Sequence, residues 1–220
     1  MKTLTIAALF VSFSLNGLAL AQSTTPEPRI LSLAEAGDKD AQAYLAALYE
    51  TGQGVLKDED KAVDLYRRAA QQGHPGAQAK LGDLHQTGQG GVWQNLVFAA
   101  YWYRKAAEQG NAHAQERLAD MYLRGQGVGQ DDAQATHWYA KAAAGGDILA
   151  QAALGGLYAR GQGVKRDPRQ AFEWTTKAAN SGYLPAQSAL AAMYAEGSGT
   201  SQDYGKAVEW GRKAADQNDA

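Results

Sequence analysis

The residues of this sequence that could carry chemistry are four histidines, several acidic clusters and a recurring Gly-x-Gly tripeptide. The histidines are His74, His85, His113 and His137, and no two of them form the i, i+4 pair that would place both on one helix face. A metal site needs several ligands that converge on one point. The chain has no cysteine, which excludes disulfides, thiol catalysis and cysteine-type zinc sites. The sequence therefore predicts no metal site and no cofactor.

The acidic clusters and the glycines have structural explanations. A phosphate-binding glycine loop follows a strand and leads into a helix that opens with Lys-Ser/Thr, whereas here a helical pattern precedes each Gly-x-Gly. Asp58-Glu59-Asp60 and Asp131-Asp132 recur at one position of a repeat, where acids cap a helix. Neither Gly-x-Ser-x-Gly nor Ser-x-x-Lys occurs in the chain. We therefore predict that the protein is not an enzyme.

Three sequence markers recur with one period along residues 41–220. The Ala-Gln pair begins at Ala41, Ala77, Ala114, Ala150 and Ala186. Gly-x-Gly begins at Gly52, Gly88, Gly125, Gly161 and Gly197, and Arg/Lys-Ala-Ala begins at Arg68, Lys105, Lys141, Lys177 and Lys213. A period of 36 or 37 residues indicates a solenoid, in which each unit buries its apolar face against its neighbours. A solenoid presents a long shallow surface, which favours protein binding over catalysis.

Each repeat carries the pattern of two amphipathic helices. In the first repeat, Ala41, Leu45 and Leu48 follow one apolar helix stripe. Gly52 is placed to end that helix, and Asp58 is placed to cap the next one. We predict an all-α fold, an αα-hairpin repeat solenoid wound as a right-handed superhelix. Its five repeats are 41–76, 77–113, 114–149, 150–185 and 186–220.

The N-terminal residues differ from the repeats. Residues 1–21 have a positive start, an apolar stretch and the small-residue site Ala19-Leu20-Ala21, which indicates a secretory signal peptide. Residues 22–28 are predicted to form a flexible leader, and residues 29–40 a half-repeat helix that covers the first repeat. We therefore expect a soluble protein that is exported to the periplasm, with secretion as the alternative. A net charge of −2 gives no indication of nucleic-acid binding.

The markers resemble the Sel1-like repeat, a relative of the tetratricopeptide repeat. The third repeat carries the family pattern in Ala114-Gln115, Gly125-Gln126-Gly127-Val128, Trp138-Tyr139 and Lys141-Ala142-Ala143. Departures include His85 in place of a tyrosine, and Tyr66 in place of the tryptophan. Arg67, Thr175 and Gly211 stand in place of the second aromatic residue.

The resemblance implies an adaptor or scaffold of the cell envelope that binds another protein. It also leaves two alternatives open: an immunity protein that neutralises a secreted toxin, and a weak β-lactam-binding hydrolase. The hydrolase branch of the family uses a disulfide in each repeat, and this chain has no cysteine.

Binding is expected on the inner wall formed by the first helices of the repeats. Removing the buried stripe leaves the outward positions three, six and ten residues after each Ala of Ala-Gln. Those singled out are Tyr44, Lys80, Asp83, Arg117, Asp120, Arg124, Gly156, Arg160 and Ala192. The wall is charged in its middle and lined by alanine and glycine toward the C-terminus. Trp93, in the loop of the second repeat that carries one extra residue, is expected to be an exposed contact residue.

Overall fold

The computed structural model of the protein describes residues 27–218, which form eleven α-helices. These are α1 (Pro28–Glu35), α2 (Lys39–Thr51), α3 (Glu59–Gln71), α4 (Pro75–Thr87), α5 (Leu96–Glu108), α6 (Ala112–Arg124), α7 (Asp132–Ala144), α8 (Ile148–Arg160), α9 (Pro168–Asn180), α10 (Leu184–Glu196) and α11 (Tyr204–Asn218). After α1 they pair into five hairpins, so the predicted all-helical repeat fold is confirmed. The predicted signal peptide, and the leader up to residue 26, lie outside the described residues.

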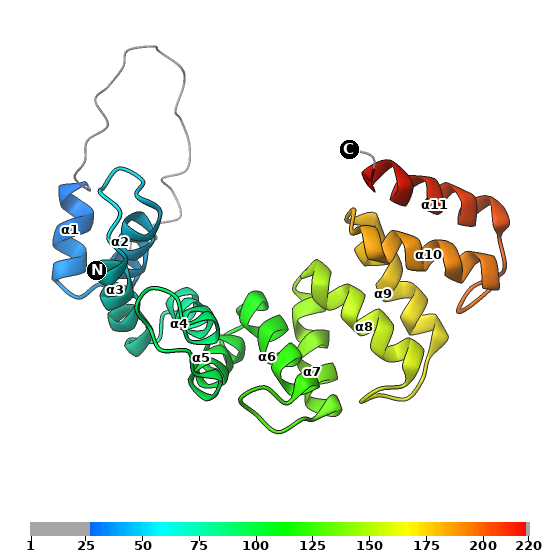
Figure 1. Ribbon diagram of the computed structural model, residues 1–220, viewed down its shortest axis with the longest axis horizontal. Coiled ribbons are helices and arrows are strands. Elements are labelled where there is room, and N and C mark those ends of the chain that lie inside the picture. Colours follow the sequence, from blue (N-terminus) through cyan, green and yellow to red (C-terminus); the bar gives the residue numbers. More distant parts are fainter. Residues whose placement is uncertain (1–26, 219–220) are drawn as a thin grey trace, which may run out of the picture.

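The hairpins stack into an open arc, with α1 and α11 at its two ends (Figure 1). Each second helix packs on the first helix of its own hairpin, and all of them except α11 also pack on the first helix of the next hairpin. The first helices α4 and α6 also contact each other directly. Elements approach one another most closely on the inside of a curve, so the first helices line the inner wall.

The predicted caps are found at the helix ends. Asp58, the predicted cap of the first repeat, and its equivalents accept hydrogen bonds from backbone N–H groups in the first turn of each second helix; these equivalents are Asn95, Asp131, Asp167 and Asp203. The first glycine of each Gly-x-Gly has a left-handed backbone, with φ of +73° at Gly52 and +66° at Gly125. His74 has a role that the sequence did not reveal, since its Nδ1 accepts the N–H of Ala77 at 3.0 Å and caps α4.

The N-terminal half-repeat is shorter than the predicted helix over 29–40. The segment predicted as one helix is divided between α1, which ends at Glu35, and α2, which begins at Lys39. Ala34 of α1 is buried with Ala41 and Leu45 of α2. The helix α1 therefore covers the first hairpin in the way that each second helix covers the hairpin after it.

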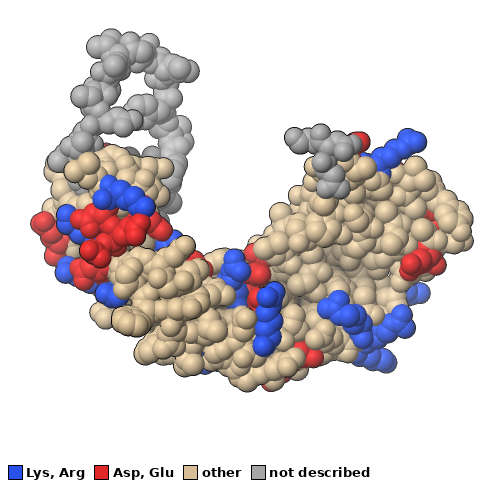
Figure 2. Space-filling model, viewed as in Figure 1, with Lys and Arg blue, Asp and Glu red and all other residues tan. Residues whose placement is uncertain are grey.

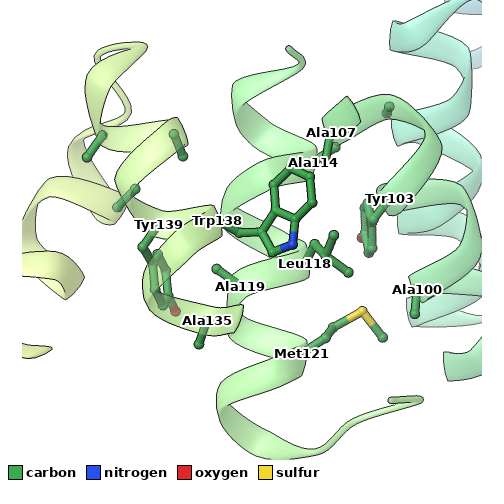
Figure 3. Close-up of a cluster of buried hydrophobic side chains, with 14 of the residues drawn as sticks. Ala100, Tyr103, Ala107, Ala114, Leu118, Ala119, Met121, Ala135, Trp138 and Tyr139 are labelled. Atoms are coloured by element: carbon green, nitrogen blue, oxygen red, sulfur yellow. The ribbon is translucent and has the colours of Figure 1, made fainter. Parts of the chain in front are cut away.

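The core runs between the hairpins as a chain of small and aromatic side chains. Figure 3 shows Leu118 and Met121 of α6 between Tyr103 of α5 and Trp138 of α7. Trp138 is buried, and the Lys141 ammonium lies 4.5 Å from its ring centroid. The same lysine-on-tryptophan contact recurs in the fourth and fifth repeats, which accounts for the spacing between the tryptophan and the Lys-Ala-Ala marker.

The glutamine of each Ala-Gln pair joins one hairpin to the previous one. Its side-chain amide donates to a carbonyl in the last turn of the preceding helix, at 3.0–3.3 Å: Gln42 to Ala34, Gln78 to Ala70, Gln115 to Ala107, Gln151 to Ala143 and Gln187 to Ala179. In three repeats its Oε1 also accepts from a glutamine at the C-terminal end of the second helix: Gln72, Gln109 and Gln217. In the fourth repeat Ser181 stands at that position, and Gln151 Oε1 is buried without a hydrogen-bond partner.

We expect Ser181→Gln to stabilise the protein by about 1 kcal/mol, because the new amide would donate to Gln151 Oε1 as its counterparts do in other repeats. The free energy of unfolding in urea measures the effect. The control is the same substitution made together with Gln151→Met, where the acceptor is absent and the gain should vanish. An equal gain in the wild-type and Gln151→Met backgrounds would show that the stabilisation comes from the surface of α9 and not from the hydrogen bond to Gln151.

Candidate protein-binding surface

A tyrosine of the second helix reaches the inner wall in each of the first three repeats. Its hydroxyl contacts a carboxylate at 2.7–3.2 Å: Tyr66 to Glu50, Tyr103 to Asp83 and Tyr139 to Asp120. This corrects the sequence interpretation of the first repeat. Tyr66 is equivalent to Tyr103 and Tyr139, so it stands at the second aromatic position, and Leu65 takes the place of the tryptophan.

Small residues of the first helix make room for these rings. Tyr103 is fully buried and crosses α4 at Gly82, where an added Cβ would lie 2.5 Å from the ring. Burial, together with the neighbouring carboxylate, raises the pKa of Tyr66, Tyr103 and Tyr139. The three hydroxyls therefore remain protonated donors that hold a carboxylate at the inner wall.

Charged side chains of neighbouring repeats pair across the middle of this wall. Lys80 Nζ lies 2.5 Å from Glu50 Oε1, and His113 Nε2 lies 2.9 Å from Asp83 Oδ1. Arg124 Nε lies 3.1 Å from Asp120 Oδ2, within α6. The structure thus brings the predicted residues Lys80, Asp83, Asp120 and Arg124 onto one wall, but it also gives each an intramolecular partner. Because the charges already satisfy one another, they offer less to a partner than the sequence implied.

The His113–Asp83 contact changes the pKa of both groups. The hydrogen bond to Asp83 raises the pKa of His113 above its ordinary value. Burial alone would raise the pKa of Asp83, but the hydrogen bonds from His113 and Tyr103 outweigh burial and the pKa is lowered. By contrast, burial lowers the pKa of His74, whose Nδ1 must stay unprotonated to cap α4.

We expect the contribution of His113 to stability to be present at acidic pH and lost as pH rises through its raised pKa. The protonated ring is the form that Asp83 favours in the folded state. Since the pair is partly exposed, His113→Gln should lower the free energy of unfolding by less than about 1 kcal/mol at pH 5.5 and by nearly nothing at pH 9. Urea unfolding at the two pH values measures this. A loss of equal size at both would contradict the charged pair.

The inner wall changes in the fourth and fifth repeats. Thr175 and Gly211 replace the tyrosine, and Gly156 and Ala192 stand where the second and third repeats carry Asp83 and Asp120. An open groove of about 590 Å³ lies here, lined by small side chains of α8 and α10 with Thr175 behind them. Its α8 and α10 residues include Ala152, Ala153, Gly156, Ala159, Ala189 and Met193. Figure 2 shows charged side chains near the middle of the arc and a broad surface with few charges in its C-terminal arm, above the blue side chains at the end of α8.

The other predicted site residues are placed as follows. Tyr44 is exposed by 54% on α2, and Arg160 is exposed on α8 beside Gly156. Ala192 is exposed on α10, next to the groove residue Met193. Trp93 is 90% exposed, as expected, but it lies in the α4–α5 loop and shares no pocket with the predicted inner-wall residues. Its role as a contact residue stays a prediction.

Sequence reasoning missed an apolar patch beside Trp93. Val97, Phe98 and Tyr101 are exposed on α5. The equivalent positions of α3 are Asp60, Lys61 and Asp64, and α7 and α9 also carry mainly polar residues there. A comparison of the repeats position by position would have revealed the difference.

A larger hollow, of about 740 Å³, lies between the first and second repeats. Its polar groups are already paired, because Glu50 accepts from both Tyr66 and Lys80, and Lys57 pairs with Glu59. We therefore regard the groove between α8 and α10 as the better binding site, since its apolar walls are uncovered. Among residues 27–218 no group of three or more metal-ligating side chains converges. No helix in the same range has the length and apolar character needed to cross a membrane.

Stacked helical hairpins with a groove on their inner wall define a helical-repeat scaffold. A family model described as the Sel1 repeat matches the chain five times, over residues 39–74, 75–111, 112–147, 148–183 and 184–219. The chain belongs to the Sel1 repeat family. Each matched unit begins two residues before an Ala-Gln pair, so it has the predicted period with a different starting point. No curated protein matches the chain.

Several solved structures share the fold. A protective antigen of uropathogenic Escherichia coli is 37% identical, with a TM-score of 0.81, over 86% of this chain and 40% of that chain. The chain thus spans well under half the length of that relative. A Sel1 repeat protein from Oxalobacter formigenes is 34% identical, with a TM-score of 0.76, over 86% of this chain and 81% of that one. An immunity protein of Pseudomonas aeruginosa is 28% identical, with a TM-score of 0.50, over 81% of this chain and 65% of that chain.

Proposed function

We propose that the protein is an exported scaffold of the cell envelope that binds a segment of another protein in the groove between α8 and α10. The observation that carries this proposal is the groove itself, an open surface of small apolar side chains on the inner wall of a repeat array. A repeat whose side chains only served packing would retain the tyrosine and the acid that close this wall in the second and third repeats. The N-terminal sequence supports export to the periplasm, with secretion as the alternative.

A second candidate is an immunity protein that neutralises a secreted toxin. The similarity to the Pseudomonas aeruginosa immunity protein supports it. Both candidates use the same surface, and they differ in the identity of the partner. An immunity protein would bind one toxin, whereas an adaptor would bind a component of the envelope.

Affinity capture from an envelope extract tests both, with residues 22–220 as bait and mass spectrometry as the readout. The matched control bait carries Gly156→Trp, which fills the groove. A partner lost on the control bait and toxic when sent alone to the periplasm would support the immunity function. An envelope component lost on the control bait would support the adaptor function. Turnover of a chromogenic β-lactam, with no partner captured, would favour the hydrolase alternative over both.

A further inference from the structure

A buried carboxylate lies at one end of the groove. Glu116 of α6 lines the groove together with residues of α8 and α10. The equivalent positions in the other repeats hold Ala43, Ala79, Ala152 and Ser188. The side chain of Glu116 is only 10% exposed. The acid is therefore not part of the pattern that the repeats share, and its side chain lines this groove.

The carboxylate of Glu116 has no hydrogen-bond donor among the residues that the structure describes. Its nearest cation is Arg117, whose Nε lies 3.4 Å from Glu116 Oε2. That nitrogen is itself buried without a hydrogen-bond partner, so the contact is not a hydrogen bond. A largely buried carboxylate that accepts no hydrogen bond is unfavourable even beside Arg117, and it gains most from a cation that donates directly to it.

Apart from Arg117, the charged groups that the structure describes around Glu116 are paired with other residues and donate no hydrogen bond to its carboxylate. Asp120 is paired with Arg124 and Tyr139, and Asp147 accepts the backbone N–H of Ala150 as the cap of α8. His113 is paired with Asp83. Burial raises the pKa of Glu116, and the negative charges of Asp147 and Asp120 add to the effect against an opposing contribution from Arg117. Burial therefore penalises the ionised form of Glu116, and a cation that donates to the carboxylate from the groove would offset that penalty.

We propose that the groove receives a polypeptide segment with a lysine or arginine side chain, whose cationic group binds Glu116 while small apolar side chains lie against α8 and α10. This inference rests on the proposed function, because it specifies the partner chemistry of the same groove. The apolar contacts supply most of the buried area, and the ion pair sets the register and direction of the segment along the groove.

Selection from a displayed library of random dodecapeptides tests the inference, with residues 22–220 as the target. We expect enriched peptides to carry Lys or Arg at one fixed position, flanked by small apolar residues. By titration calorimetry, Glu116→Gln should weaken the best peptide by at least about tenfold, and replacing its basic residue with glutamine should weaken it equally. The wild-type affinity should rise with pH as Glu116 ionises, and Glu116→Gln should remove that rise.

Glu196→Gln is the matched control, because Glu196 lines the other end of the groove and is exposed. It should leave the affinity within about twofold. Enriched peptides without a basic residue, or equal losses in the two variants, would overturn the inference while leaving the proposed binding groove in place. Failure to enrich any peptide over the Gly156→Trp target would instead overturn the proposed function.

Discussion

We expect Gly127→Ala to destabilise the protein by about 3 kcal/mol or more. Gly127 is the second glycine of its Gly-x-Gly, with a left-handed backbone at φ +69°. An added Cβ would lie 2.1 Å from the carbonyl oxygen of Leu96, at the start of the preceding second helix. The variant therefore adds a collision with rigid backbone to the cost of a left-handed alanine, and it forces the second and third repeats apart.

Substitutions at two other glycines separate the cost of a left-handed alanine from the cost of the collision with backbone. Gly125→Ala has the same backbone strain, but its nearest contacts would be Gln130 Cβ at 3.3 Å and the Gln130 backbone nitrogen at 3.4 Å, far looser than the contact at Gly127. In the second repeat, the extra loop residue changes the packing, and a Cβ on Gly90 would meet the side-chain ends of Val63 and Leu84 at 3.1 and 3.4 Å. Each control should cost about 1–2 kcal/mol. Urea midpoints measured by circular dichroism compare the three variants, and equal losses would contradict the backbone contact.

The number, type and spacing of the helices were predictable because each rests on local chemistry. Asp58 and its equivalents cap a helix through their own backbone neighbours, and Gly52 ends one through its own φ. The assignment of Tyr66 to the tryptophan position was wrong because the tryptophan and the second aromatic residue of the pattern are adjacent, as in Trp102-Tyr103 and Trp138-Tyr139, and the first repeat keeps only one aromatic residue there. The spacing to the Arg/Lys-Ala-Ala marker resolves the one-residue ambiguity, because Tyr66 and Tyr139 each lie two residues before it, and the contact of the Tyr66 hydroxyl with Glu50 agrees.

The candidate site was only partly predictable, because which of its charged side chains are already paired depends on contacts between different repeats. The helix pattern correctly placed Lys80 and Asp83 on the first helices. It carried no information that Lys80 meets Glu50 or that His113 meets Asp83, because each pair joins residues 30 positions apart in the chain. Glu116 was missed for a related reason. Its position, two residues after the Ala of Ala-Gln, was not among the outward positions considered, and the burial of its side chain appears only when the surrounding helices are in place.

The groove arises from coordinated losses rather than from an insertion. In the third repeat the Tyr139 hydroxyl holds Asp120 at the wall, so the ring and the acid together fill the space above the first helix. In the fourth repeat Thr175 is too short to cross α8, and Gly156 offers no acid for it to hold. Losing only the tyrosine would leave an unsupported carboxylate at the wall. Losing both leaves an apolar surface without an orphaned polar group at these positions, which is a surface suited to a partner.

We expect Gly156→Trp to abolish binding in the groove while leaving the fold intact. A Cβ on Gly156 would meet only the guanidinium of Arg160, at 3.1 Å, and that side chain can move into solvent. Tryptophan is also a better helix former than glycine by roughly 0.5 kcal/mol. The indole would then occupy the space between α8 and α10, and the affinity for a captured partner should fall at least about a hundredfold.

Gly155→Ala, at the neighbouring position, is expected to destabilise the fold, whereas Gly156→Trp is expected to block binding. Its Cβ would lie 2.6 Å from Thr175 Oγ1 and 3.2 Å from the Thr175 backbone nitrogen, so α8 and α9 must separate. This variant should lose about 1–3 kcal/mol of stability, whereas Gly156→Trp should keep the wild-type unfolding midpoint. Calorimetric binding and urea unfolding of both variants separate blocking from misfolding. If Gly156→Trp folds and retains full affinity, the partner binds elsewhere on the array and the groove is only a by-product of the lost tyrosine.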